Sequence, residues 1–261
     1  MDIPIYQVDA FAERLFGGNP AAVCPLETWL PDETLQAIAA ENNLSETAFF
    51  IPLDDGYHIR WFTPKREVAL CGHATLATAH VLFHELGYSG ERLRFASLSG
   101  ELVVEREGDR LVLDFPSQPP QPCEVPAGLL EALGGEPLEV WFSAEDYLVV
   151  YGAAQAIRDL RPDFARLAQV EARGIAVTAP GEGEVDFASR FFAPRVGINE
   201  DPVTGSAHCK LTPLWSRRLD KTKLLARQLS SRGGEVHCRL NGERVLLAGR
   251  GVSYLKGRIT I

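Results

Sequence analysis

The chain lacks the features that mark several large classes of protein. No uninterrupted apolar stretch approaches the ~20 residues of a membrane-spanning helix, and no run of basic residues is present. Lysine and arginine total 26 against 35 acidic residues, which gives a formal charge of −9 at pH 7. This balance disfavours nucleic acid and anionic membranes as partners. Because no charged and apolar leader pattern opens the sequence, we expect a cytoplasmic protein.

Cysteine is scarce, and its arrangement favours neither disulfides nor a metal. The five cysteines form an odd, widely spaced set, which fits a reducing compartment. His208-Cys209 and His237-Cys238 are adjacent pairs, but neighbouring side chains diverge, so each pair offers one convenient ligand. His80 and His84 lie one helical turn apart without a carboxylate spaced to match. We therefore expect no metal and, since phosphate-binding loops and the Gly-x-Ser-x-Gly turn are also absent, no cofactor.

What the sequence does contain is an internal repeat. In the first copy, Trp61–Pro64 precedes Cys71–Thr75, which opens an apolar helical run. In the second copy, Arg190–Pro194 precedes Glu200–His208, which opens another. Each copy belongs to a half of about 120 to 140 residues, enough to bury a core of its own. The repeat predicts an α/β (α+β) protein with two pseudo-symmetric lobes, each a sheet wrapped around a central helix.

Proline marks the boundary between the lobes. Residues 116–122 contain four prolines, which is typical of a semi-rigid, extended linker. We therefore place the N-terminal lobe at residues 1–117, the linker at 118–122 and the C-terminal lobe at 123–252. The closing strand, residues 253–261, has no counterpart in the repeat and is expected to pair back with the first lobe. Pro213 falls inside the second central helix, where it should kink the helix or remove a hydrogen bond.

Four polar side chains stand where core packing predicts none. His73 and Ser206 occupy matching places at the two helix starts. Asp201 lies in the loop before the second start, and Glu46 precedes a strongly hydrophobic strand. Carboxylate and imidazole groups are suited to moving a proton. The set predicts proton abstraction next to a carboxylate or a conjugated system, without a cofactor.

The two helix starts themselves predict the kind of substrate. A helix N-terminus presents unpaired N–H groups and positive partial charge, which hold carboxylates well. Gly72 and Gly205 allow the backbone to approach a ligand closely there. Two such starts facing one cleft would bind a small carboxylic acid without an arginine clamp.

Each polar residue also has a purely structural interpretation. Glu46 fits a turn with a solvated carboxylate, and His73 fits an early-helix residue whose ring is hydrogen-bonded. Asp201 and Ser206 flank a helix start, where Asp, Ser and Thr are preferred caps, and Thr204 is a further candidate for the cap. On sequence alone, these interpretations remain open beside the catalytic one.

Six motifs, taken together and in order, resemble the phenazine-biosynthesis PhzF-like family. They are VDAF (8–11), GNP (18–20), NLSETAF (43–49), FTP (62–64), GHA (72–74) and DPVTGSAH (201–208). The resemblance implies the diaminopimelate-epimerase-like fold, with the site in the cleft between two lobes, and a homodimer. The family's best-understood member is a cofactor-free isomerase of a dihydro-hydroxyanthranilic acid.

By this resemblance, Glu46 moves the proton, while His73 and Asp201 orient the substrate or relay the proton. The substrate carboxylate is held by Ser206 and by the amides of the two helix starts. The positions assigned to substrate binding are Ser45, Gly72, Gly205 and Ser206.

The cysteines distinguish the predicted isomerase from the related epimerases and racemases. Related epimerases and racemases use one cysteine from each lobe as paired acid and base. Cys71 stands close to the first of these positions, whereas Pro202 stands at the second. Since inversion by opposed bases needs both thiols, we expect an isomerase that moves a proton on a small carboxylic acid. The alternatives are an amino-acid epimerase that uses Cys71 and a non-catalytic member of the fold that binds a metabolite or a protein.

Overall fold

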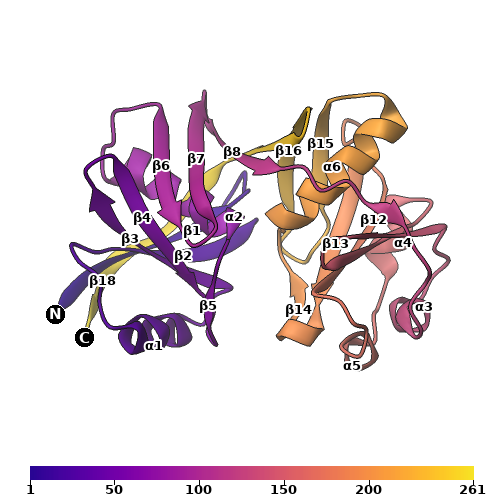
Figure 1. The fold of residues 1–261 in the computed structure, drawn as a ribbon, viewed down its shortest axis with the longest axis horizontal. Helices are drawn as coiled ribbons and strands as arrows, with labels where there is room; N and C mark the ends of the chain where they lie inside the picture. The colour runs from indigo at the N-terminus through magenta and orange to yellow at the C-terminus, as the bar shows by residue number, and fades with distance from the viewer. The chain divides into compact units, whose positions relative to one another are not determined.

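The computed structural model describes all 261 residues, which divide into two compact units. Unit 1 comprises residues 1–114 and 248–261, and unit 2 comprises residues 115–247 (Figure 1). The proline-rich stretch 118–122 lies in unit 2, where β9 (Gln121–Pro122) pairs with β10 (Glu139–Ser143). None of the helices combines the length and the apolar character that a bilayer crossing requires.

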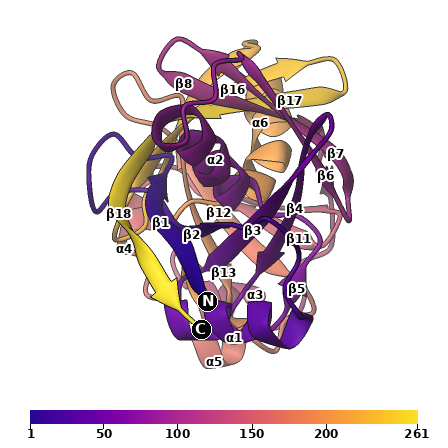
Figure 2. The same cartoon turned by 90° about the vertical axis from the view of Figure 1, so that its left-hand side faces the viewer.

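Unit 1 is a mixed sheet wrapped around a central helix (Figure 2). Its strands lie in the order β18-β1-β2-β3-β4-β6-β7-β8, and β5 pairs with β4. The β2–β3 and β4–β6 pairs are parallel and the others antiparallel. The strands are β1 (Asp2–Ala10), β2 (Asn19–Pro25), β3 (Glu46–Leu53), β4 (Gly56–Phe62), β5 (Glu67–Val68), β6 (Arg92–Ser97), β7 (Gly100–Glu107), β8 (Arg110–Pro116) and β18 (Gly251–Thr260).

The central helix of unit 1 is α2 (Gly72–His80), and residues 73–80 are all buried. It packs against β1, β2, β3 and β18 (Figure 2). The buried hydroxyls of Thr75 and Thr78 donate to carbonyls four residues earlier, so neither is left unpaired. The helix continues as a short π-helix, η1 (Val81–Glu85). The second helix, α1 (Asp32–Asn42), contacts β3 and β4 and buries its apolar residues in a separate core cluster.

Unit 2 repeats this arrangement strand by strand. Its strands lie in the order β9-β10-β11-β12-β13-β15-β16, and β14 pairs with β13 as β5 does with β4. The parallel pairs, β11–β12 and β13–β15, correspond to those of unit 1. The remaining strands are β11 (Asp146–Val150), β12 (Gly174–Pro180), β13 (Phe187–Ala193), β14 (Ile198–Asp201), β15 (Lys223–Gln228), β16 (Gly234–Asn241) and β17 (Arg244–Gly249).

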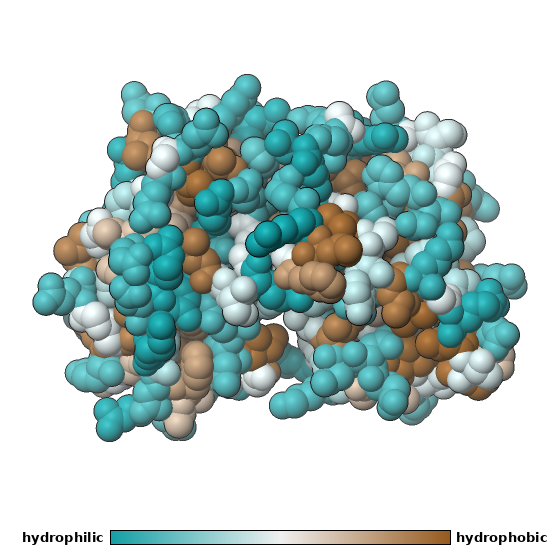
Figure 3. Space-filling view, turned by 180° about the vertical axis from the view of Figure 1, so that it is seen from behind, coloured by the Kyte–Doolittle hydropathy of each residue, from teal (hydrophilic) through white to brown (hydrophobic).

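The central helix of unit 2 is α6 (Gly205–Leu219), which packs against β15 and β16. Three short helices, α3 (Leu129–Leu133), α4 (Ala154–Asp159) and α5 (Phe164–Leu167), bury apolar residues in one cluster with β11, β12 and β13. A 3₁₀ turn, η2 (Pro194–Val196), lengthens the connection between β13 and β14. On the face shown in Figure 3, apolar residues form small, separate groups among hydrophilic ones.

One ion pair occupies the same place in each unit. Arg60 on β4 donates to both carboxylate oxygens of Glu67 on β5, at 2.7 and 2.8 Å. Arg190 on β13 does the same to Glu200 on β14, at 2.7 and 3.0 Å. We call these pairs the Arg–Glu clamps. Because a bidentate pair fixes the relative orientation of the strands that carry it, the clamps provide matching reference points in the two units.

Pro213 lies inside α6 and removes one hydrogen bond of that helix. Since proline has no N–H, the carbonyl of Cys209, four residues earlier, loses its helical donor. The N–H of Gln118 replaces it and donates to that carbonyl at 3.0 Å. The hydrogen bond expected to be lost is therefore lost, and the proline-rich stretch satisfies the freed acceptor.

Candidate functional site

Glu46 and His73 come together in unit 1. Glu46 is the first residue of β3, and His73 is the second residue of α2. Their side chains are 13% and 7% exposed, and Glu46 Oε2 lies 3.2 Å from His73 Nε2. The two atoms are within ion-pair distance, but their alignment falls outside hydrogen-bond geometry. A carboxylate this buried, beside an imidazole, is not the solvated turn residue of the structural interpretation.

Burial also sets the protonation state of His73. Desolvation lowers its pKa to about 3, so the ring is neutral at pH 7. The amide nitrogen of Asn19 lies 3.3 Å from His73 Nδ1. Because an amide N–H only donates, Nδ1 accepts and the ring proton stands on Nε2. The protonated nitrogen of the neutral ring thus faces the carboxylate of Glu46.

Cys71 adds a third group to this cluster. It is the N-cap of α2, and its Sγ lies 3.5 Å from His73 Nδ1. Donor atoms of Cys71, His73 and Glu46 all lie within 4.8 Å of one another. Thiolate, imidazole and carboxylate together form a donor set that suits Zn²⁺. The sequence identifies all three residues, but it does not show that they touch.

In unit 2, Thr204 rather than Ser206 is the N-cap of α6. Its Oγ1 donates to Asp201 Oδ2 at 2.5 Å. The fully buried Gln228 holds this loop, since its Oε1 accepts from the N–H of Thr204 and its Nε2 donates to the carbonyl of Asp201. Gln228 is not among the residues predicted from the sequence. The sequence feature that points to a buried Gln228 is the alternation of side chains along β15, which places it on the buried face with Leu224 and Ala226.

The helix caps correct one predicted correspondence. Cys71 and Thr204 are both N-caps with extended backbone, and a glycine follows each. The counterpart of Cys71 is therefore Thr204 and not Pro202. The clamp glutamates Glu67 and Glu200 each stand five residues before these glycines, which gives the same correspondence. Unit 2 accordingly carries a hydroxyl where unit 1 carries a thiol.

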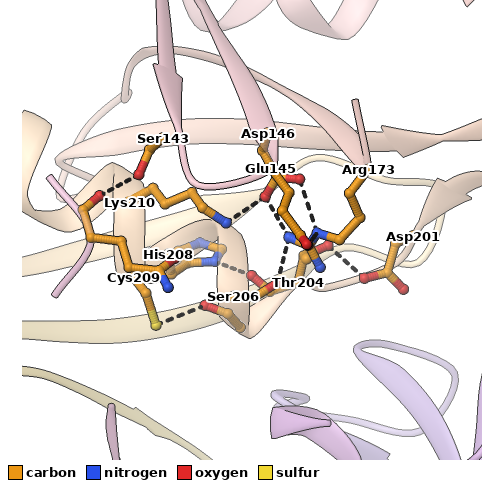
Figure 4. Close-up of polar contacts among 12 residues, drawn as sticks. Ser143, Glu145, Asp146, Arg173, Asp201, Thr204, Ser206, His208, Cys209 and Lys210 are labelled. Atoms are coloured by element: carbon orange, nitrogen blue, oxygen red, sulfur yellow. Dashed lines mark hydrogen bonds and ion pairs between the residues drawn. The ribbon is translucent and has the colours of Figure 1, made fainter. Parts of the chain in front are cut away.

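A charge cluster that is not predicted from the sequence lies beside Ser206 (Figure 4). Asp146 is fully buried and accepts from Arg173 Nε at 2.9 Å, from Arg173 Nη2 and from Lys210 Nζ at 2.5 Å. Arg173 Nη2 also donates to Ser206 Oγ at 3.0 Å. Burial lowers the pKa of Lys210, and the charge of Asp146 opposes this shift. One carboxylate thus holds two cations at the start of α6.

The strand registers show what replaces Glu46 in unit 2. Phe49 faces the clamp arginine of unit 1 across the β3–β4 pair, and Val177 faces that of unit 2 across the β12–β13 pair. Counting three residues back from each gives Glu46 in unit 1 and Gly174 in unit 2. By the same count, Arg173 occupies the place that Ser45 has in unit 1.

Gly174 has no room for a side chain. A Cβ built there would lie 2.1 Å from Cζ of Phe191, which is far inside van der Waals contact. A side chain at position 174 would require the Phe191 ring to move, and unit 2 carries no carboxylate at the place where unit 1 carries Glu46.

We expect Gly174→Ala to lower the free energy of unfolding by about 1–3 kcal/mol, because the added methyl overpacks the core. Gly152→Ala is the matched control, since its Cβ would lie 3.8 Å from Leu138 Cδ1, an ordinary contact. Urea unfolding of both variants measures the difference. Equal stability of the two variants would contradict the steric account.

Buried histidines make the protein sensitive to acid. Desolvation lowers the pKa of His208 to about 4, and the backbone hydrogen bond to Thr204 partly opposes it. Below pH 6.5 the unfolded chain protonates His73 and His208, while the folded protein keeps them neutral until about pH 3 and 4. The unfolded state then binds more protons, so stability falls as the pH falls.

Between pH 7 and pH 5, we expect each of these two histidines to cost about 2 kcal/mol of stability. Urea unfolding at both pH values measures the change. His208→Gln should remove its share of the pH dependence. An unchanged pH slope in that variant would refute the assignment.

Comparison with known proteins identifies the family. Residues 8–257 match the model of the phenazine biosynthesis-like protein family. The chain belongs to this family. Two relatives from Pseudomonas aeruginosa, both named as uncharacterized isomerases, are 56% and 54% identical over at least 99% of each chain. The human phenazine biosynthesis-like domain-containing protein is 41% identical over 100% of both chains.

Solved structures share the fold. A crystal structure of a PhzF-family protein from Enterococcus faecalis has a TM-score of 0.97 at 45% identity, covering 100% of both chains. A hydroxyproline epimerase from Agrobacterium vitis has a TM-score of 0.64 at 11% identity, covering 99% of this chain and 91% of its own, which shows the fold alone. The predicted family and the diaminopimelate-epimerase-like fold are therefore confirmed. The predicted enzyme class is confirmed by the relatives that are named as isomerases.

Proposed function

We propose that the protein is a cofactor-independent isomerase that moves a proton on a small carboxylic acid, with Glu46 as both base and acid. The observation that carries this proposal is the 3.2 Å separation between the Glu46 carboxylate and the Nε2 of a neutral, buried His73. Names of relatives support the reaction class, since three of them are called isomerases.

A single carboxylate suffices when a proton leaves one carbon and returns to another on the same face of the substrate. Glu46 would take the proton, and the N–H of His73 would stabilise the carboxylate or the negative charge that develops on the substrate. Inversion of a stereocentre needs a second group on the opposite face. The glycine at position 174 leaves no side chain at the place equivalent to Glu46. This asymmetry supports a proton shift rather than racemisation.

The other predicted residues keep their roles within the proposal. Ser45 adjoins Glu46, and the amide of Gly72 opens α2, so both are proposed to bind the substrate in unit 1. Gly205 and Ser206 are proposed to bind its carboxylate in unit 2. Asp201 is proposed to relay a proton or to orient the substrate, with Thr204 fixing its carboxylate. A small carboxylic acid, cyclic or amino, is the proposed substrate class, and a cytoplasmic homodimer is the proposed state.

The second candidate is an amino-acid epimerase that uses Cys71. The observation that favours it is the contact of Cys71 Sγ with His73 Nδ1 at 3.5 Å. Its weakness is that the matching residue in unit 2 is Thr204, whose hydroxyl is a far poorer acid and base than a thiol.

Hydrogen exchange in heavy water tests both candidates. The protein is incubated in D₂O with a panel of cyclic and α-amino carboxylic acids, and deuterium incorporation is followed by proton NMR and mass spectrometry. We expect incorporation into an unsaturated cyclic acid that Cys71→Ser leaves intact. Incorporation at the α-carbon of an amino acid that Cys71→Ser abolishes would favour the epimerase. No incorporation into any acid of the panel would sink the isomerase proposal.

A further inference from the structure

Arg173 is a rigid guanidinium with one edge left open. Its Nε and Nη2 donate to Asp146, and its plane lies over the ring of Phe191, 5.4 Å from the centroid. Its Nη2 also donates to Ser206, while Nη1 donates to no protein group. The side chain is 33% exposed. Glu145 contacts it loosely, at 3.7 Å from Nε, and is 72% exposed. The open edge is therefore available to a ligand and fixed in direction.

Around this edge, two cations share one buried carboxylate. Arg173 and Lys210 bring two cations, and Asp146 brings the one buried anion. Lys210 is 3% exposed and its Nζ donates to Asp146. Arg173 is therefore the cation of this cluster that a ligand can reach. Glu145 lies at the solvent side, where screening weakens its effect. An anionic ligand that replaced the exposed Glu145 beside this half-buried guanidinium would make charge-assisted hydrogen bonds to it.

Ser206 supplies a second donor next to the open edge (Figure 4). Its Oγ accepts from Arg173 Nη2 at 3.0 Å, so the hydroxyl proton is free to point elsewhere. A carboxylate has two oxygens that match a guanidinium N–H and a neighbouring hydroxyl. This arrangement differs from the expectation of a carboxylate site without an arginine, because the strand register brings Arg173 to the start of α6.

We propose that Arg173 and Ser206 form a subsite for an anionic group, with the open edge of the guanidinium and the serine hydroxyl as its two donors. The ligand chemistry is a carboxylate of the substrate. Asp146 and Lys210 hold the guanidinium in place, and Arg173 sets the preference for a charged over a neutral ligand. This proposal depends on the proposed function in one respect: the anion that the subsite binds is the carboxylate of the substrate.

An acid and its amide test the subsite directly. Binding of benzoate and of benzamide is measured by calorimetry or by ligand-observed NMR, because the two probes share shape and differ in charge. We expect the protein to bind benzoate about 10- to 100-fold more tightly than benzamide. Arg173→Gln should remove this preference without changing benzamide binding, and Arg173→Lys should keep part of it. Arg166→Gln is the matched control, since Arg166 is 71% exposed and pairs with an exposed carboxylate.

Each outcome decides the proposal. Wild-type protein that does not prefer benzoate, including protein that binds neither probe, overturns the subsite. So does Arg173→Gln protein that keeps the preference. Urea unfolding of the variants confirms that they are folded, and the Lys variant retains the charge if the Gln variant is too unstable to measure. The assay needs no turnover. Failure of hydrogen exchange, with an Arg173-dependent preference intact, would refute the isomerase and leave the subsite standing.

Discussion

Replacing Glu46 by glutamine should lower isomerase turnover by about 10²- to 10⁴-fold. Glutamine keeps the size of the side chain but cannot accept a proton at neutral pH. Because Glu46 is 13% exposed and adjoins a neutral histidine, little bulk water reaches it to act as a substitute base. Deuterium incorporation from heavy water into the substrate identified by the panel measures the loss.

The control is Glu101→Gln, on β7 of the same unit, where the carboxylate is 54% exposed. We expect this variant to exchange hydrogen at the wild-type rate. Glu46→Gln protein with full turnover would remove Glu46 from the mechanism. Equal losses in both variants would instead point to a general effect on folding.

Replacing Asp146 by asparagine should destabilise the protein by about 3–5 kcal/mol. The carboxylate is fully buried and is the shared partner of Arg173 and Lys210. Its removal leaves two cations in a poorly solvated place without a counter-charge. Urea unfolding at pH 7 measures the loss.

Asp163→Asn is the matched control, since its pair with Arg166 is 3.4 Å apart and both side chains are at least half exposed. A change of about 0–1 kcal/mol is expected there. The double variant Asp146→Asn with Lys210→Met should recover part of the lost stability, because it removes one of the stranded cations. If Asp146→Asn costs no more than Asp163→Asn, the buried cluster is not a stabilising unit.

The sequence predicts the fold well because the fold is a repeat of local patterns. Each helix start, with its glycine, and each strand before it leaves a pattern that needs no knowledge of distant contacts. His73 and Ser206 are placed correctly at the starts of α2 and α6 for the same reason. The one misplaced counterpart is Pro202, although the matched glycines that follow Cys71 and Thr204 already give the right pairing.

The residues that sequence reasoning missed are those fixed by distant pairings. Arg173 is 27 residues from Asp146 and 33 from Ser206, and Asp146 is 64 residues from Lys210. No local pattern relates them, because the register of β11 and β12 places Asp146 beside Arg173, and α6 brings Ser206 and Lys210 to them. Gln228 is joined to the loop at Thr204 from 24 residues away. Such contacts follow from the assembled sheet, not from motifs.

The contact between Gly174 and Phe191 has a consequence for the order in which this sequence can change. A glutamate introduced at position 174 would meet the aromatic ring, which a Cβ there already overlaps at 2.1 Å. A smaller residue at position 191 would have to come first, as a permissive substitution, and it would also take away the ring under Arg173. The two positions are thus epistatic. Under the proposed one-base mechanism, gaining a second carboxylate at position 174 requires a change at Phe191, and that change removes the ring under Arg173.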